Sequence, residues 1–404
     1  MAKGRENLTH IGIFGRTNTG KSTLINVLSG QETAIVSPIP GTTTDPVKKS
    51  IEIIGLGNVV LIDTAGIDDI SKLGVQRVNK TLQTLDLIDI AILVIADNIF
   101  GESEINLINK FIENEIPYLI VANKTDIVKV DLKIKDLVSN QFEKDIISVS
   151  SLLEENISHL IDKLISCKRE SAYQNTSLLS GIVKHGDLVL LVTPIDSEAP
   201  EGRLILPQVN LIRNSLDSGC ITIVVRDSEL EEFLNSYQLK PRIVITDSQV
   251  FGKVSKIVPD DILLTGFSVL LARQKGDFDE YIKGTPKIDN LKDGDRVLLL
   301  ESCTHTSSCE DIGRVKIPAW LRKYTGKKLE FDIVAGLDSL NRDIHDYSLV
   351  IQCGGCVITR RQLINRLKKA KDAGIPISNY GLAIAYMHGI FERAVKPFNL
   401  NELG

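Results

Sequence analysis

The residues with the clearest chemical purpose lie near the start of the chain, in the segment 15–22, which reads GRTNTGKS. This segment fits the pattern G-x-x-x-x-G-K-[ST]. It stands between a strand-like run and a helix-like run, the context that a phosphate-binding loop needs. Backbone N–H groups of such a loop and the start of the next helix attract phosphate oxygens. We expect Lys21 to contact the β- and γ-phosphates of a nucleotide and Ser22 to coordinate Mg²⁺. The residues expected to contact the nucleotide here are Asn18, Thr19, Gly20, Lys21, Ser22 and Thr23.

Two further groups of polar residues follow predicted strands. Asp63 ends the run 59–63 and suits the Mg²⁺ shell, and the N–H of Gly66 suits a γ-phosphate oxygen. The segment 123–126, Asn-Lys-Thr-Asp, ends another strand, where the ligand pocket of a parallel α/β sheet is expected. The Asp126 carboxylate can accept hydrogen bonds from both N1–H and the exocyclic amino group of guanine, a donor pair that adenine lacks. Together these motifs predict a site for GTP and GDP.

This set of motifs resembles the TRAFAC class of GTPases over about residues 9–168. The resemblance implies a P-loop GTPase domain in which Asn123 and Asp126 bind guanine and Lys124 packs on the base. It also implies that Ser150 and Ser151 complete the base-binding loop. Ser151 departs from the alanine that is usual at its place.

The sequence differs from Ras-like proteins at Ile67, which stands where they carry the glutamine that orients the attacking water. Isoleucine has no hydrogen-bonding side chain, so charge stabilisation must come from another group. The segment 40–45, PGTTTD, resembles the first switch of the tRNA-modification and ribosome-assembly GTPases, which makes Thr43 the Mg²⁺-binding threonine. Asn18 corresponds to the asparagine that helps to hold K⁺ in the K⁺-dependent members, and an ordinary turn residue is the alternative. The resemblance implies a K⁺-stimulated GTPase with Lys21, Thr43 and Asn18 as catalytic residues.

Four of the six cysteines lie after residue 300, and two of their segments follow predicted strands. Cys303-Thr304-His305 is one, and the segment 353–356, CGGC, is the other. Loops at the carboxyl ends of strands can form one site, and the two thiolates of C-x-x-C can converge on one metal or cluster. From the residues alone, zinc and an iron–sulfur cluster fit about equally. A dithiol redox pair and buried free cysteines are the further alternatives. We expect Cys309 to be a loop thiol, and Cys167 and Cys220 to be small core residues.

A TRAFAC-type GTPase followed by C-x-H and C-x-x-C resembles the FeFe-hydrogenase maturation GTPases, the HydF family, over the whole chain. The resemblance implies a scaffold that binds a 4Fe–4S cluster through Cys303, Cys353 and Cys356. It further implies that the scaffold accepts a diiron precursor made with two radical-SAM maturases and delivers it to apo FeFe-hydrogenase. The family usually has a histidine directly before C-x-x-C, where this chain has Gln352. The fourth iron site is therefore open, or is filled by His305, a nearby carboxylate or water.

The elements that must position these residues alternate along the chain. Short apolar runs separated by helical stretches predict an α/β fold, with a P-loop GTPase domain and two smaller α/β domains of mainly parallel sheets. We place these domains at 1–170, 181–263 and 264–404, with a polar linker at 168–180. The middle domain has no catalytic motif, and its apolar run Ile221–Val225 suits edge pairing, so we expect a homodimer through it. The strands are expected at 9–14, 59–63, 90–95, 118–122, 188–194, 221–225, 242–246, 296–301, 329–335 and 347–352, and the helices at 21–29, 75–85, 102–114, 157–167, 209–215, 229–236, 359–372 and 380–390.

Composition excludes several classes of protein. The 404 residues are 43% apolar and 25% charged, which is typical of globular proteins and not of disordered chains or coiled coils. No apolar run reaches the roughly 18 residues of a membrane span, and no secretory signal is recognisable, so we expect a cytoplasmic protein without membrane contact. The net charge of −5 argues against nucleic acid as a partner.

The alternative function is a ribosome- or tRNA-associated GTPase with a structural zinc domain. No C-x-x-x-C-x-x-C motif is present, so we expect no radical-SAM catalysis by this chain itself.

Overall fold

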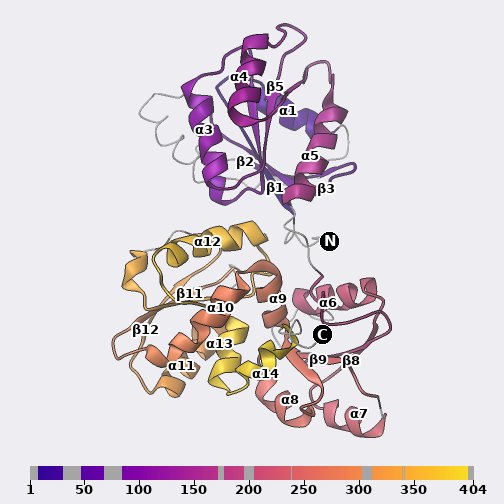
Figure 1. Cartoon of the computed structure of the whole chain (residues 1–404), viewed down its shortest axis with the longest axis vertical. Helices are drawn as coiled ribbons and strands as arrows, with labels where there is room; N and C mark the ends of the chain where they lie inside the picture. Colours follow the sequence, from indigo (N-terminus) through magenta and orange to yellow (C-terminus); the bar gives the residue numbers. More distant parts are fainter. Residues whose placement is uncertain are drawn as a thin grey trace. The chain divides into compact units, whose positions relative to one another are not determined.

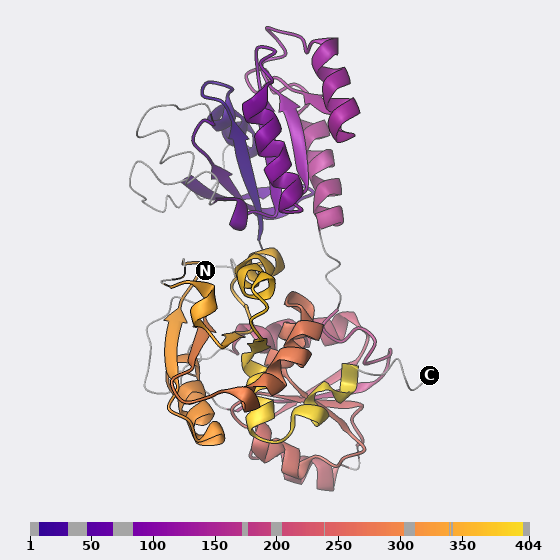
Figure 2. The same cartoon turned by 60° about the vertical axis from the view of Figure 1, so that its left-hand side comes forward.

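The computed structural model describes residues 8–30, 47–67, 84–171, 177–194, 204–237, 239–302, 312–338, 340 and 342–398. Of the predicted site residues, Thr43, Cys303 and His305 lie outside these ranges, as do Cys309 and almost all of the helix predicted at 75–85. The chain divides into two compact units, Met1–Gln174 and Asn175–Gly404, which are described separately (Figures 1 and 2). No described helix is long and apolar enough to cross a membrane.

The first unit is built on a six-stranded sheet with the order β2-β3-β1-β4-β5-β6. Its strands are β1 (Thr9–Gly15), β2 (Val47–Ile53), β3 (Gly57–Asp63), β4 (Ile90–Ile95), β5 (Tyr118–Ala122) and β6 (Ile146–Ser148). All described pairs are parallel except β2 with β3. The strands predicted from apolar runs are confirmed. β2 and β6 were not predicted, because β2 is interrupted by lysines and β6 has only three residues.

Helices cover both faces of this sheet. They are α1 (Lys21–Leu28), α3 (Glu102–Glu113), α4 (Leu132–Phe142) and α5 (Ile157–Ser171), with a short 3₁₀ turn at Thr84–Asp86. Alternate strand residues point to opposite faces, so one apolar core forms with α1 and α5 and another with α3 and α4.

The predicted linker began too early, because α5 continues to Ser171. Lys168 in its last turns donates a hydrogen bond to the Leu56 carbonyl at 2.7 Å.

The second unit contains two parallel four-stranded sheets. One has the order β10-β9-β7-β8, from β7 (Leu188–Val192), β8 (Ile221–Val225), β9 (Ile243–Thr246) and β10 (Leu263–Gly266). Its helices are α6 (Leu206–Asp217), α7 (Leu230–Ser236), α8 (Phe251–Ile257) and α9 (Phe267–Lys275). Because β10 begins at Leu263, this sheet extends past the residue at which the sequence analysis ended the middle domain. The prediction of an α/β fold with mainly parallel sheets is confirmed.

The other sheet has the order β12-β11-β13-β14, from β11 (Arg296–Leu300), β12 (Glu330–Val334), β13 (Leu349–Gln352) and β14 (Ile377–Asn379). Its helices are α10 (Phe278–Gly284), α11 (Ile317–Thr325), α12 (Arg360–Asp372), α13 (Tyr380–Met387) and α14 (Phe391–Val395). Shorter helical turns lie at Thr285–Asn290, Ile312–Lys316, Ile344–Asp346 and Lys396–Phe398. α9 contributes apolar side chains to the cores of both sheets, and α13 and α14 do the same, so the two sheets form one unit (Figure 1).

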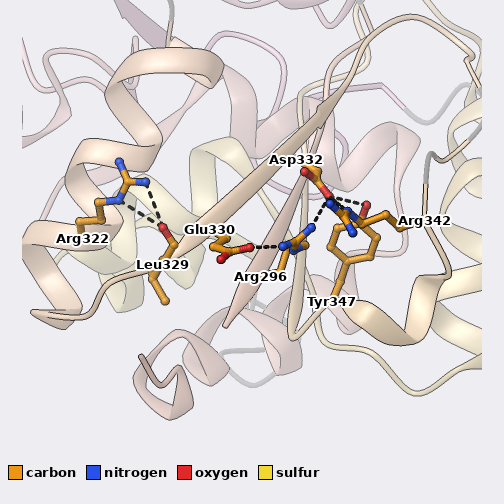
Figure 3. A network of polar contacts seen from close by, with 7 residues as sticks. All are labelled: Arg296, Arg322, Leu329, Glu330, Asp332, Arg342 and Tyr347. Carbon is orange, nitrogen blue, oxygen red and sulfur yellow. Dashed lines mark hydrogen bonds and ion pairs between the residues drawn. The ribbon is translucent and has the colours of Figure 1, made fainter. Parts of the chain in front are cut away.

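A polar network joins β11 to its edge neighbour β12 (Figure 3). Arg296 on β11 pairs with Glu330 and, at 3.4 Å, with Asp332 on β12. Asp332 also accepts hydrogen bonds from Arg342 at 3.1 Å and from the hydroxyl of Tyr347 at 3.0 Å. The tyrosine is buried, and burial together with Asp332 raises the pKa of Tyr347 to about 12. This network fixes the register of the edge strand with charged groups that also discourage unwanted strand pairing.

Candidate nucleotide site and two-cysteine loop

The segment 15–22 connects β1 to α1, as its motif predicted. Lys21 is 8% exposed, and its ammonium donates to the carbonyls of Gly15 at 3.0 Å and Arg16 at 2.7 Å. Thr19 closes the same turn, since its hydroxyl donates to the Arg16 carbonyl at 2.9 Å. The loop therefore curves around the lysine, which places a positive charge beside the backbone N–H groups at the start of α1.

The backbone of this loop requires its glycines. Gly15 has φ +147° and Gly20 has φ +87°, conformations that disfavour other residues. A Cβ atom on Gly15 would lie 2.2 Å from the Val94 carbonyl oxygen, and one on Gly20 would lie 2.3 Å from Nδ2 of Asn123. Asn18 also has a positive φ, of 63°, which asparagine tolerates better than most residues.

Two of the three predicted Mg²⁺ ligands meet in the structure. The Ser22 hydroxyl, in the first turn of α1, donates to Oδ2 of Asp63, at the end of β3, at 2.8 Å. Mg²⁺ prefers oxygen ligands of this kind, so the pair fits the ion. The neighbouring Ile67 has its N–H bonded to the Gly15 carbonyl at 3.3 Å, and its side chain packs on the apolar core beside α3. It offers the site no polar group, as predicted.

Asn123 makes structural hydrogen bonds that the sequence analysis did not predict. Its side chain is buried, donating through Nδ2 to the Thr19 carbonyl at 3.0 Å and accepting through Oδ1 from the Ser151 N–H at 3.0 Å. It thus connects the phosphate loop to the loop that contains Ser150 and Ser151. The Ser151 hydroxyl is buried and has no hydrogen-bond partner among the described residues. Asp126 lies exposed on the surface after β5.

Lys124 is held by a residue that the sequence analysis missed. It adopts a positive φ of 59°, and its ammonium lies 3.3 Å from Oδ2 of Asp97, just after β4. β4 and β5 are neighbours in the sheet, so this pair joins two adjacent carboxyl ends. Asp97 belongs to no recognisable motif, so the sequence analysis did not identify it.

In the second unit, the segment 353–356 directly follows β13 and meets the end of β11. The Sγ atom of Cys353 accepts a hydrogen bond from the Ser302 N–H at 3.1 Å and lies 3.0 Å from the Ser302 hydroxyl. β11 and β13 are paired, with Leu300 opposite Gln352. Ser302 is the residue before Cys303 in the chain. Burial raises the pKa of the Cys353 thiol, against the opposing effect of its hydrogen bonds with Ser302.

Close packing and backbone conformation require a glycine at one of the two glycine positions of this loop, Gly355. Gly355 has φ +66°, and a Cβ there would lie 2.6 Å from Cδ1 of Leu363 on α12. A Cβ on Gly354 would touch Cδ1 of Leu271 on α9 at 3.4 Å. Among the described residues, no three His, Cys, Asp or Glu side chains gather as metal ligands, and the other predicted ligands, Cys303 and His305, lie outside them.

Gln352 lies beside the Cys353 sulfur and is completely buried. Its amide nitrogen donates to the Ser302 hydroxyl at 3.2 Å and lies 3.5 Å from Sγ of Cys353. Its Oε1 has no hydrogen-bond partner among the described residues, and the same holds for the buried hydroxyl of Tyr281 on α10. Burial is the main cause that raises the pKa of Tyr281, so this phenol remains a hydrogen-bond donor. Gln352 and Tyr281 therefore each have unused hydrogen-bonding capacity in the described residues.

Comparison with protein families gives matches to three separate regions of the chain. Residues 10–124 match the profile of a 50S ribosome-binding GTPase. Residues 178–276 match the hydrogen maturase F dimerization domain, and residues 279–397 match the hydrogen maturase F tetramerization domain. The last two matches together cover more than half of the chain. This chain belongs to the hydrogen maturase F family. The resemblance inferred from the motifs is thereby confirmed, and the chain combines a P-loop GTPase domain with the two oligomerisation domains of that family.

Two curated GTPases with other names each match only part of the chain. The tRNA modification GTPase MnmE of Leptospira interrogans is 37% identical over 158 residues, which are 38% of this chain and 33% of that protein. GTPase Der of Chloroflexus aurantiacus is 35% identical over 170 residues, 39% of this chain and 38% of that protein. The chain thus spans about a third of the length of these curated relatives. A crystal structure of Aquifex aeolicus Era bound to GDP and aluminium fluoride is 27% identical, covering 40% of this chain and 56% of Era, with a TM-score of 0.33.

Proposed function

We propose that this hydrogen maturase F family member is a GTP-hydrolysing scaffold that binds a 4Fe–4S cluster and delivers a diiron precursor to apo FeFe-hydrogenase. The observation that carries the proposal is the contact between Cys353 and Ser302. It brings the C-x-x-C loop to Ser302, which lies just after β11 and one residue before Cys303. The partners in this proposal are the apo-hydrogenase and the radical-SAM maturases that make the precursor, all in the cytoplasm.

The GTPase half of the proposal rests on the loop geometry. Lys21 places its charge where β- and γ-phosphates bind, and Ser22 with Asp63 holds Mg²⁺, with Thr43 as the third protein ligand. Asp126 selects guanine, supported by Asn123, Lys124, Ser150 and Ser151. Because Ile67 cannot orient water, K⁺ held near Asn18 supplies the charge stabilisation during hydrolysis.

The cluster half of the proposal rests on the donor set. Cys303, Cys353 and Cys356 are the thiolates, and thiolates favour iron–sulfur clusters or zinc over hard cations. The N–H of Ser302 and the amide of Gln352 point at the Cys353 sulfur, and hydrogen bonds to sulfur tune such clusters. A cluster bound here supplies an iron site with an exchangeable fourth position, open or held by His305, a carboxylate or water. That position suits a carrier which must receive and release a diiron unit.

Oligomerisation completes the proposal. The family descriptions of residues 178–276 and 279–397 name dimerization and tetramerization. β8 is an edge strand of its sheet, and Ile221 and Val224 on it are 59% and 42% exposed. We infer a homodimer that pairs through this edge. The middle domain in this arrangement includes β10, so it extends beyond residue 263.

Metal analysis of anaerobically purified protein tests the proposal. We expect iron and sulfide, with an EPR signal after reduction, whereas zinc alone would favour the ribosome- or tRNA-associated alternative. Cys303→Ser, Cys353→Ser and Cys356→Ser should each sharply reduce cluster loading and hydrogenase activation. GTP hydrolysis should survive, since its residues lie in the other unit. Cys309→Ser is the matched control and should keep its iron. Full iron in Cys353→Ser with loss in Cys309→Ser would show that the thiols are wrongly assigned.

A further inference from the structure

A buried lysine holds the two-cysteine loop. Lys275, the last residue of α9, is 6% exposed, and its ammonium donates to the carbonyls of Gly355 at 2.7 Å and Ile358 at 2.9 Å. Burying an ammonium is costly unless hydrogen bonds compensate for the lost water. One of these acceptors, Gly355, lies inside the C-x-x-C segment itself, and the other lies two residues after Cys356. The lysine is therefore hydrogen-bonded to the loop on both sides of that cysteine.

The attachment between α9 and the loop runs in both directions. Arg360, the first residue of α12, donates from Nη1 to the Gln274 carbonyl at 2.8 Å, so a cation from the far side of the loop satisfies a carbonyl at the end of α9. A Cβ on Gly354 would lie 3.4 Å from Cδ1 of Leu271, one turn earlier in the same helix, so the start of the loop lies close to α9. The segment 355–360 is thus fixed to the end of α9 by the hydrogen bonds of Lys275 and Arg360.

This helix lies in the other family-matched region. α9 falls within residues 178–276, the match to the dimerization domain, while the loop falls within residues 279–397, the match to the tetramerization domain. The two hydrogen bonds of Lys275 span 80 and 83 residues of sequence. Lys275 is therefore a residue of one region that is hydrogen-bonded to the two-cysteine loop of the other.

We propose that Lys275 is a positioning residue for the cluster: it fixes the loop so that the sulfurs of Cys353 and Cys356 converge, and it places a positive charge beside the anionic site. The inference rests on the cluster-binding function proposed above. A cluster with thiolate ligands is anionic and gains further negative charge on reduction. A nearby buried cation stabilises the reduced form more than the oxidised form, because charges interact strongly away from water. Removing the cation should therefore make the cluster harder to reduce.

Three variants test this role in the full-length protein. Lys275→Met removes the charge and the donors, Lys275→Arg keeps a cation with N–H donors, and Lys283→Met is the control. Lys283 lies on α10, its side chain is 72% exposed, and it pairs with Glu280 at 3.5 Å. The measurements are hydrogen exchange of the amides of residues 353–358 in protein stripped of metal, the rate of iron loss to a chelator after reconstitution, and the midpoint potential from an EPR-monitored titration.

We expect Lys275→Met to speed both loop exchange and iron loss by about tenfold or more, the effect of losing charge-assisted hydrogen bonds, and to shift the midpoint potential to more negative values. Lys275→Arg should return the potential toward that of the wild type, and Lys283→Met should match the wild type in all three measurements. If Lys275→Met does not fold, Lys275→Gln replaces it with the same expected directions. Wild-type exchange and iron retention in the neutral variant would overturn the proposal.

The measurements distinguish a failure of this inference from a failure of the proposed function. If the wild type takes up no iron–sulfur cluster, the cluster function fails and the electrostatic role of Lys275 fails with it. If the wild type binds the cluster but the neutral variant leaves the potential and loop exchange unchanged, only the role of Lys275 fails. Faster exchange together with a more negative potential supports both parts.

Discussion

The guanidinium of Arg16 in the phosphate loop forms a two-point ion pair with the carboxylate of Glu104 at the start of α3. Nε lies 2.7 Å from Oε1 and Nη2 lies 3.0 Å from Oε2. Glu104 is 1% exposed, and its Oε2 also accepts from the Gly101 N–H at 2.9 Å. One buried carboxylate therefore caps α3 and fixes the second residue of the phosphate loop.

Removing this carboxylate should destabilise the first unit. We predict that Glu104→Ala lowers the unfolding free energy of that unit by about 1.5 to 3 kcal/mol, because it removes charge-assisted hydrogen bonds to a partly exposed Arg16. The measurement is native-state hydrogen exchange of the β1 amides. The control is Asp217→Ala, which breaks the exposed pair with Arg213 on α6 and should leave the exchange of β1 unchanged. Equal exchange in the two variants would contradict the prediction.

Nucleotide choice should depend on Asp126. We predict that Asp126→Asn weakens GTP binding by at least about 100-fold and improves binding of xanthine nucleotides, whose C2 carbonyl needs a donor. Binding titrations with the two nucleotides measure this. Asp136→Asn, an exposed residue on α4, is the control and should bind GTP normally. Unchanged GTP affinity in Asp126→Asn would refute the assignment of the base-reading residue.

The sequence predicted the contacts that belong to local motifs and missed those made by distant side chains. β4 and β5 are continuous apolar runs, and the Ser22–Asp63 pair follows from two motifs whose chemistry requires one shared ion. Glu104 reaches Arg16 across 88 residues, and Lys275 reaches Gly355 across 80. No periodicity or spacing marks such partners, because only the packing of separate elements brings them together. The short strand β14 was missed for a related reason, since three residues carry too little pattern.

The edge network of Figure 3 should make the second unit sensitive to alkali. The pKa of Tyr347 is raised to about 12, so its neutral form is favoured by folding. Its stabilising contribution is complete below pH about 10, the unfolded value, and is lost as pH rises from there to about 12. We predict a loss of about 2 to 3 kcal/mol in unfolding free energy over this range that Tyr347→Phe lacks.

Urea unfolding followed by tryptophan fluorescence measures this effect, because Trp320 is the only tryptophan and lies in the second unit. At neutral pH, Tyr347→Phe should be less stable than the wild type by about 1 kcal/mol, through the lost hydrogen bond to Asp332. At pH 11.5 that difference should shrink or reverse. A constant difference at both pH values would show that Tyr347 does not titrate as predicted.

Self-association should depend on the exposed edge of β8. We predict that the double variant Ile221→Lys, Val224→Lys sediments as a smaller species than the wild type, since charges on an edge strand oppose pairing with another copy. Point changes are better than deletion of residues 181–263, because α13 and α14 pack on this sheet. Ile54→Lys, at a side chain 94% exposed in the first unit, is the control. An unchanged sedimentation coefficient in the double variant would move the interface elsewhere.

GTP hydrolysis should be faster in K⁺ than in Na⁺ at equal ionic strength, by roughly tenfold, because Ile67 leaves transition-state charge to be stabilised by a bound cation. The geometry of Asn18 decides the best variant. Its φ of 63° would strain an alanine, whereas glycine keeps the loop conformation and removes only the side-chain amide. We predict that Asn18→Gly retains GDP binding and loses the difference between K⁺ and Na⁺, measured as phosphate release in each salt. Equal rates in the wild type, or a preserved K⁺ effect in Asn18→Gly, would assign Asn18 to the turn alone.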